Sequence, residues 1–288
     1  MNLRDALEHY LSDKPRSAAT LRRYRDNLRA HFAALGGDDR DVTEVTRAEV
    51  VAWRNAQDQL GLSPWTVAGH ARDVKAFWAW LARAGLIAVS PAATLKVPQF
   101  RPRSLETLAI STEALQRVLL MARADPRNYA IVRFLADTGC RRAALCSLRL
   151  DRLNLDAQIA TLVNKGGSLY DVSLSSRAVG ALAEYLPTRP QVAHPFVFTS
   201  KRPPYPPLTP IGLSTFWRRL CLKAGLNGHC GLHSVRHHFA VRLARAGVNM
   251  AYIQDALGHT DMKTTRLYVR VLRDKLLEAV EDASLPDP

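Results

Sequence analysis

The stretch from Gly231 to Arg270 concentrates polar side chains that can act together on a phosphate. It contains three short segments: G-L-H-S-V-R-H-H-F-A at 231–240, L-G-H-T at 257–260 and T-T-R-L-Y at 264–268. Imidazole, guanidinium and phenol groups are poor core material, because each needs a hydrogen-bond partner when it is buried. Together they suit a phosphodiester, since an arginine can bind the non-bridging oxygens, a histidine can carry a proton and a tyrosine can attack.

The spacing of these side chains predicts how they are arranged. His233, Arg236 and His237 stand at i, i+3 and i+4, so a helix places them on one face. His259 follows a Leu-Gly pair that is typical of a helix end, and Tyr268 comes nine residues later. A tyrosine such as Tyr268 taken alone is more often a core or interface residue, so the chemical interpretation depends on the whole set.

Composition narrows the class of protein. The 288 residues are 47% hydrophobic, which is enough for one large or two ordinary domains. No apolar run approaches the roughly 18 residues of a membrane span, and residues 1–9 are charged, without an apolar signal region. We therefore expect a cytoplasmic protein with no membrane partner.

The cysteines do not form a metal-binding pattern. No two of them stand as C-x-x-C. Cys230 and His233 are close enough in sequence to suggest zinc, but no second pair completes a site. We expect ordinary reduced thiols and no metal.

The positive charge is large and uneven. The net charge is +14, and residues 111–288 hold 24 basic against 14 acidic side chains. Between Glu184 and Asp255 there is no acidic residue but there are nine lysines and arginines. A solvated surface normally mixes both signs, so this stretch indicates a polyanionic partner, above all nucleic acid. Anionic lipid is the alternative, but the sequence shows no basic amphipathic anchor helix.

The N-terminal segment is predicted to form four helices, at Asn2–Leu11, Ala18–Leu35, Arg47–Leu60 and from Ser63-Pro64 to near Gly85. The aromatic side chains of the fourth helix, Phe77 and Trp78, are expected in the core. The second helix carries four arginines for which we favour phosphate contact over a merely solvated face: Arg22, Arg23, Arg25 and Arg29.

Residues 89–110 have the composition of a linker, with three prolines and few periodic apolar positions. We therefore expect one domain at 1–88 and a second domain at 111–288. The second domain is expected to be mostly α-helical, with a hairpin at Gln158–Val163 and Tyr170–Leu174 and a further short strand at Phe196–Thr199. Its helices are predicted at Thr112–Arg123, Arg127–Asp137, a short segment through Leu148, Ser176–Leu186, Ile211–Ala224, Leu232–Gly247, Met250–Leu257 and Leu272–Asp282.

Two more cations complete the pattern, Arg141 exposed at a helix break and Lys165 at the hairpin tip. The order T-G-x-R, a hairpin lysine, H-x-x-R-H, L-G-H and then a tyrosine resembles the tyrosine recombinase family, the phage integrases and Xer-type recombinases. The resemblance covers residues 111–288, and the four-helix segment resembles the family's SAM-like core-binding domain. The catalytic set that it implies is Arg141, Lys165, His233, Arg236, His259 and Tyr268.

The sequence departs from the family pattern at two places. The family often has Glu or Asp three residues after the first arginine, where this chain has Ala144. The hairpin also lacks the usual second lysine and arginine, so its grip on DNA is expected to be weaker. Neither departure removes a reacting group, but the loss of the acid is expected to soften the geometry around Arg141 and His233.

The resemblance implies that Tyr268 attacks the scissile phosphate of duplex DNA, which gives a 3′-phosphotyrosyl link and a free 5′-hydroxyl without ATP, metal or other cofactor. Arg141 and Arg236 would hold the non-bridging oxygens, and Lys165 would protonate the leaving oxygen. His233 would assist proton transfer to and from Tyr268, and His259 would hydrogen-bond the phosphate.

The resemblance also implies assembly. The two domains of each chain would close round duplex DNA. The active assembly on two synapsed sites at the nucleoid would be a homo-tetramer, or this chain paired with a related recombinase. The apolar stripe that follows the tyrosine, which includes Leu272, Leu276 and Val280, is expected to dock into a neighbouring subunit, with packing on its own domain as the alternative.

Two other functions stay open at this stage. A type IB topoisomerase uses the same chemistry as a monomer, and a non-catalytic DNA-binding accessory protein would be consistent with Ala144. The sequence does not give the target site or the biological role.

Overall fold

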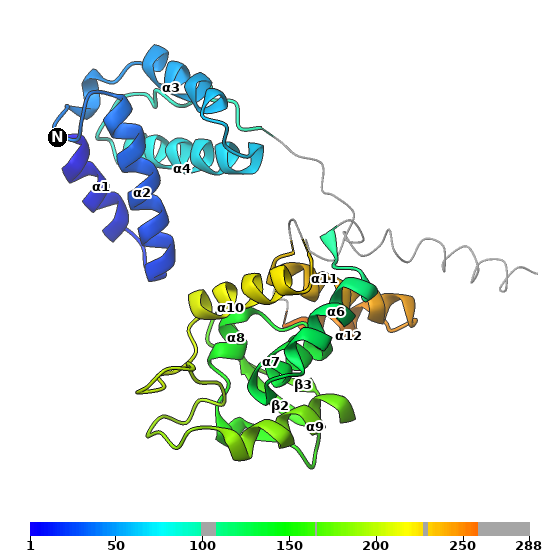
Figure 1. Cartoon of the computed structure of the whole chain (residues 1–288). Coiled ribbons are helices and arrows are strands. Elements are labelled where there is room, and N and C mark those ends of the chain that lie inside the picture. Colours follow the sequence, from blue (N-terminus) through cyan, green and yellow to red (C-terminus); the bar gives the residue numbers. More distant parts are fainter. Residues whose placement is uncertain (99–107, 165, 227–229, 259–288) are drawn as a thin grey trace, which may run out of the picture. The chain divides into compact units, whose positions relative to one another are not determined.

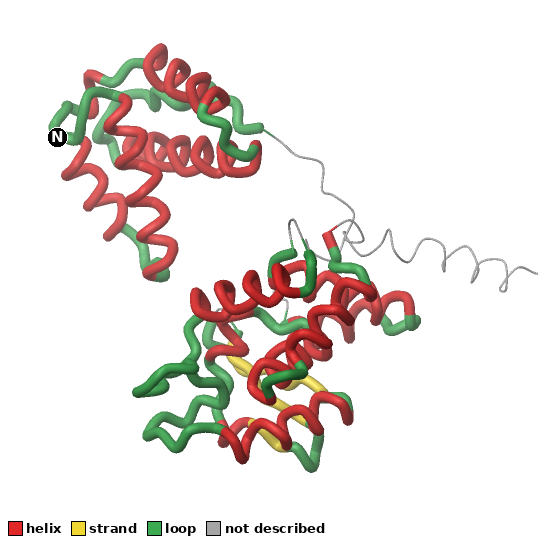
Figure 2. The backbone as a smooth tube through the Cα atoms, viewed as in Figure 1, coloured by secondary structure: helices red, strands yellow, loops and turns green. Residues whose placement is uncertain are grey.

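The computed structural model describes residues 1–98, 108–164, 166–226 and 230–258 (Figure 1). This part of the chain is mainly α-helical with a small antiparallel sheet, as Figure 2 shows, and the predicted fold class is confirmed. The chain folds into two compact units, Met1–Arg101 and Pro102–Pro288. Within the described ranges, no helix is long and apolar enough to cross a membrane.

The N-terminal unit contains four α-helices and one 3-10 turn in its described residues: α1 Leu3–Ser12, α2 Ala18–Ala34, Val42–Glu44, α3 Arg47–Gln59 and α4 Pro64–Arg83. Side-chain oxygens of Ser17 and Ser63 cap α2 and α4, and Thr46 forms a capping box with Glu49 at the start of α3. The helices therefore begin where the sequence signals predict, and their ends differ by one or two residues.

The core of this unit is aromatic. Phe77 and Trp78 on α4 have no exposed surface, which confirms their expected place in the core. The Trp78 indole donates a hydrogen bond of 3.1 Å to Nε2 of His31 on α2. Burial lowers the pKa of His31 to about 3, so this imidazole stays neutral and accepts the bond.

The segment after α4 packs more closely than its linker composition suggests. Ala92 and Leu95 are buried in the N-terminal core, and Lys75 donates to the main-chain carbonyl of Leu95. Two apolar side chains three residues apart therefore pack this stretch against the N-terminal core, although it has no helical periodicity.

The second unit is built around one central helix. Its α-helices are α6 Thr112–Ala122, α7 Pro126–Thr138, α8 Arg142–Cys146, α9 Ser176–Tyr185, α10 Pro210–Lys223, α11 Leu232–Arg245 and α12 Met250–Leu257. The helix α7 contacts α6, α9 and α11 and lies among them in Figure 1. Side chains around its whole circumference are buried. A helix that is covered on every side in this way forms the middle of a core.

The sheet has the order β1-β2-β3, with β1 Leu153–Asn154, β2 Ile159–Val163 and β3 Leu169–Ser173. Both pairs are antiparallel, and Ala160 faces Val172 in the β2–β3 register. Alternate residues of β2 are buried, so one face of the sheet packs on the helices. The sequence analysis did not predict β1, because two residues are too short to show alternation.

One predicted strand is wrong. Phe196–Thr199 forms only isolated bridges, from Phe196 to Arg149 and from Thr199 to Pro207. The chain that would continue the pairing is rich in proline, which has no N–H to donate to a ladder. The predicted helix Leu272–Asp282 lies outside the described residues.

Candidate active site

Two helices end side by side at glycines that adopt the left-handed conformation. Gly139 ends α7 with φ 57°, and Gly258 ends α12 with φ 59°. A Cβ on Gly139 would lie 2.6 Å from a ring carbon of Phe239, so only glycine fits there. Such a helix end leaves main-chain carbonyls without partners inside the helix, and they are available to other donors.

Arg236 uses these carbonyls to connect the two helix ends. Its side chain on α11 is buried, and its two terminal nitrogens donate to the carbonyl oxygens of Gly139 at 2.9 Å and Leu257 at 2.8 Å. The C-terminal end of a helix carries partial negative charge, which favours a cation at this place. One guanidinium therefore fixes α7, α11 and α12 relative to each other.

Arg141 reaches the same end of α12. It is the residue before α8, and its Nη1 donates to the carbonyl of Gly258 at 2.9 Å and to Asn164 Oδ1 at 3.1 Å, with the carbonyl of Leu257 at 3.5 Å. The expectation that Arg141 is exposed is wrong, because the side chain is only partly accessible. The two arginines thus converge on one turn from different elements.

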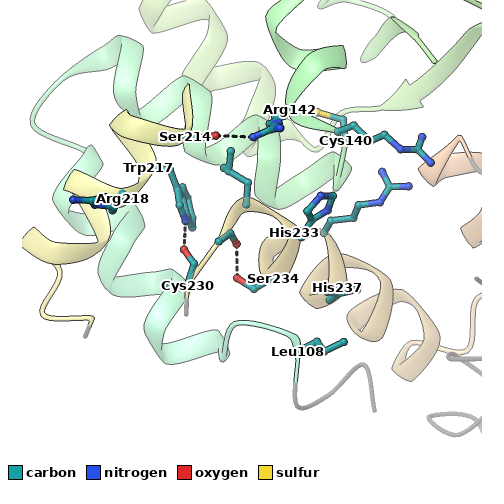
Figure 3. Close-up of a pocket in the computed structure, with 14 residues that line it drawn as sticks. Leu108, Cys140, Arg142, Ser214, Trp217, Arg218, Cys230, His233, Ser234 and His237 are labelled. Atoms are coloured by element: carbon teal, nitrogen blue, oxygen red, sulfur yellow. Dashed lines mark hydrogen bonds between the residues drawn. The ribbon is translucent and has the colours of Figure 1, made fainter. Parts of the chain in front are cut away.

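A cleft of about 710 Å³ opens beside these arginines (Figure 3). It is lined by the turn between α7 and α8, by part of α10 and by the start of α11, and it includes Arg141, His233 and Arg236. His233 is exposed within it, whereas His237 is partly buried. The structure therefore brings together the first arginine and the histidine-arginine pair of the predicted set.

The imidazoles of this cleft are kept neutral by their surroundings. Although the His233 side chain is exposed to the cleft, the surrounding protein removes part of its water, and this partial desolvation lowers its pKa below the ordinary value. The positive charges of Arg236, Arg142 and Arg141 lower it further. The pKa of His237 is lowered to about 4 by burial and then by His233 and Arg236. A neutral His233 at pH 7 can accept a proton from an attacking group.

Three members of the predicted set, Lys165, His259 and Tyr268, lie outside the described residues. Lys165 directly follows Asn164 in the sequence, and His259 directly follows Gly258. The described neighbours of these two residues, Asn164 and Gly258, each accept a hydrogen bond from Arg141.

Ala144 stands where the family often has an acid, and a different side chain, Asn164, contacts Arg141. Ala144 is buried in the hydrophobic core of the unit and offers no polar side chain. Asn164 contacts Arg141, and the sequence analysis missed this residue. Its position directly before the hairpin lysine was the available signal.

The four arginines of α2 do not share one environment. Arg23 forms an ion pair of 3.0 Å with Asp73 on α4, and Arg25 forms one of 3.2 Å with Glu8. Arg22 and Arg29 are exposed. A second cleft, of about 500 Å³, lies between α2 and α4 and is lined by polar side chains that include Arg23, Asn27, Thr66, His70 and Arg72. The contribution of α4 to this surface was missed, because its sequence was interpreted only for its apolar face.

The described residues contain no cluster of three or more side chains that could hold a metal ion. Cys140, Cys146 and Cys221 are buried, Cys230 is partly exposed, and none of them forms a disulfide. The chemistry available in this part of the cleft is that of guanidinium and imidazole groups.

Comparisons with known proteins identify the family. The phage integrase family matches residues 110–275, and the phage integrase N-terminal SAM-like domain matches residues 5–85. The chain is 30% identical over 284 residues to the tyrosine recombinase XerC of Xanthomonas campestris pv. campestris (strain B100), covering 97% of this chain and 87% of that protein. It is 31% identical over 301 residues to the tyrosine recombinase XerC of Mycobacterium sp. (strain JLS), covering 98% of each.

Solved structures share the fold. A crystal structure of XerA recombinase is 24% identical with a TM-score of 0.56, covering 98% of each chain. The Tn1549 transposon integrase in complex with transposon right end DNA is 17% identical with a TM-score of 0.76, covering 99% of this chain and 100% of that chain. A lambda integrase dimer bound to a COC′ core site is 18% identical with a TM-score of 0.70, covering 91% and 96%.

The chain belongs to the phage integrase family of tyrosine recombinases and is Xer-like within it. It is accordingly a DNA strand transferase of site-specific recombination.

Proposed function

We propose that Tyr268 cuts one strand of a duplex recombination site while Arg141 and Arg236 bind the scissile phosphate. The observation that supports this most is the convergence of Arg141, Arg236 and His233 on one cleft. Both guanidiniums donate to main-chain carbonyls, which carry no formal charge. Each such electrostatic group is typically worth about 10²–10³ in rate.

The proposed reaction balances without a cofactor. The Tyr268 oxygen forms a bond to phosphorus, and the bond from phosphorus to the 5′ oxygen breaks. His233 accepts the phenol proton, Lys165 gives a proton to the leaving 5′ oxygen, and His259 hydrogen-bonds the phosphate. The 3′-phosphotyrosyl link keeps the energy of the broken bond, so attack by a 5′-hydroxyl reverses the step and rejoins the strand.

Binding of double-stranded DNA is assigned to both parts of the chain. We divide it into a core-binding domain at 1–88, a linker at 89–110 whose first residues pack on that domain through Ala92 and Leu95, and a catalytic domain at 111–288. The arginines of α2 and the acid-free stretch between Glu184 and Asp255 would contact phosphates and hold the protein on the nucleoid.

The test of cleavage is covalent trapping on a nicked duplex, followed on a denaturing gel. The wild-type protein is expected to form an adduct, and Tyr268→Phe is expected to form none while it binds the duplex nearly as well, because it loses only the attacking oxygen. Tyr252→Phe, at an exposed tyrosine on α12, is the matched control and should behave as the wild type. An adduct with the Tyr268→Phe variant, or none with the wild type, would contradict the proposal.

We further propose that the active form is a tetramer on two synapsed sites, held by the segment after Tyr268. Truncation after Arg270 should spare binding to a single site and reduce the joining of paired sites in a gel shift. Unchanged pairing would refute this role for the segment. The relatives give no support to the alternative of a type IB topoisomerase. Relaxation of supercoiled DNA without strand exchange would favour that alternative over the proposed recombinase.

A further inference from the structure

Asn164 touches two parts of the proposed active site at once. Its Oδ1 accepts a hydrogen bond of 3.1 Å from Nη1 of Arg141. A Cβ built on Gly258 would lie 2.7 Å from the same Oδ1 and 3.1 Å from Nδ2 of Asn164. The amide therefore lies directly against the turn at the end of α12, beside the guanidinium that contacts both the amide and that turn.

The main chain of Asn164 is held as well. Its N–H donates to the carbonyl of Ser168 at 2.8 Å, and its own carbonyl accepts from the N–H of Gly167 at 2.9 Å. These two bonds close the hairpin turn between β2 and β3. The position of the Asn164 side chain is thus fixed by the sheet, and a change of side chain leaves both bonds in place.

Arg141 has no carboxylate three residues further on, because Ala144 stands there and is buried in the hydrophobic core. The acceptors that Arg141 contacts in the described ranges are the amide of Asn164 and the carbonyls of Leu257 and Gly258. Of these three, only the amide belongs to a side chain. All are uncharged oxygens, so they orient the guanidinium without cancelling its charge.

We infer that Asn164 is a positioning residue for Arg141 that does the orienting work of the missing acid. This inference rests on the proposed function of Arg141 at the scissile phosphate. Asn164 also contacts both that arginine and the turn at Gly258. In the sequence, Lys165 directly follows Asn164, and His259 directly follows Gly258. An arginine that loses this acceptor can rotate away from the phosphate, and catalysis depends on that orientation.

The test compares Asn164→Leu with Asn164→Asp on a nicked duplex, with the cleavage rate measured in a single turnover and the binding constant measured separately. Leucine has a similar size but no acceptor, so cleavage should slow by about tenfold or more, as expected when a charged donor loses its acceptor. The binding constant should stay near the wild-type value. Aspartate keeps an acceptor in the same place but offsets part of the positive charge of Arg141, so it should restore part of the rate that leucine loses.

Thr161→Val is the matched control for the sheet. Its hydroxyl donates to Asp171 on the neighbouring strand at 2.6 Å, away from Arg141, so its loss should leave the cleavage rate unchanged. Wild-type cleavage by Asn164→Leu would overturn the inference. Equal loss in the Leu and Asp variants would also overturn it, because the acceptor would then not matter. Absence of an adduct with the wild-type protein would instead refute the proposed function itself.

Discussion

Replacement of Arg236 by lysine tests whether one guanidinium holds two helix ends together. The side chain is buried, and it donates to Gly139 on one side and Leu257 on the other. The ammonium of lysine keeps the charge but lacks the planar fork, so it cannot reach both carbonyls in this geometry. A buried carbonyl that loses its donor costs about 1–3 kcal/mol.

We therefore expect Arg236→Lys to reduce the free energy of unfolding by about 2 kcal/mol, which lowers the Tm of a domain of this size by roughly 4–8 °C. Calorimetry of the full chain measures this. Arg142→Lys is the matched control, because Arg142 lines the same cleft but is exposed, and among the described residues its side chain donates to Ser214 alone. Its Tm should stay close to the wild-type value.

The same variant should also affect cleavage, which is measured separately from stability. Arg236→Lys should slow covalent trapping as well, since a single ammonium cannot bind two phosphate oxygens as a guanidinium does. If Arg236→Lys and Arg142→Lys melt together at the wild-type Tm, then Arg236 does not connect the helix ends and the argument fails.

Four further predictions follow from other parts of the structure. Gly139→Ala should cost about 2–4 kcal/mol of stability, because alanine strains the backbone and meets the Phe239 ring; calorimetry measures this against Gly36→Ala, which has the same sign of φ but open space. Because the pKa of His233 is lowered below its ordinary value of 6.5, the loss of single-turnover cleavage on the acid side should be centred below pH 6.5; a loss centred above 6.5 would contradict this. The pKa of His31 is about 3 in the folded chain and near 6.5 in the unfolded chain, so only the unfolded state takes up a proton between these values. As the pH is lowered from 6.5 towards 3, the free energy of unfolding should therefore decrease by up to about 1.4 kcal/mol per pH unit, and urea unfolding should show a smaller decrease for His31→Gln. DNA affinity should drop steeply between about 50 and 200 mM salt, and a flat gel-shift titration would count against phosphate contact.

The helices of the N-terminal unit could be predicted because their signals are local. Ser17, Thr46 and Ser63 each precede a run with helical spacing, and each side chain does cap a helix. A cap needs only a short polar side chain within a few residues of the free N–H groups, so it is visible in the sequence. The core position of Phe77 and Trp78 followed from spacing in the same way.

The contacts of the site could not be predicted because they connect distant residues. Arg141 and the carbonyl of Leu257 are separated by 116 positions, and the acceptor is a main-chain atom that any residue would supply. Nothing in the sequence near Arg141 indicates this partner. The burial of Ala92 and Leu95 was missed for a related reason, since it depends on a core formed by other helices.

The two helix-ending glycines explain why the arginine motifs have their form. In T-G-x-R and L-G-H, the sequence alone indicates only that the glycine stops a helix, because glycine adopts a positive φ at low cost. The same turn at Gly139 and Gly258 leaves carbonyls free, and those carbonyls receive Arg236 and Arg141. A carboxylate in their place would hold the arginines but would cancel part of their charge. Helix ends therefore fix two guanidiniums and leave them positive, which is the condition for binding a phosphate.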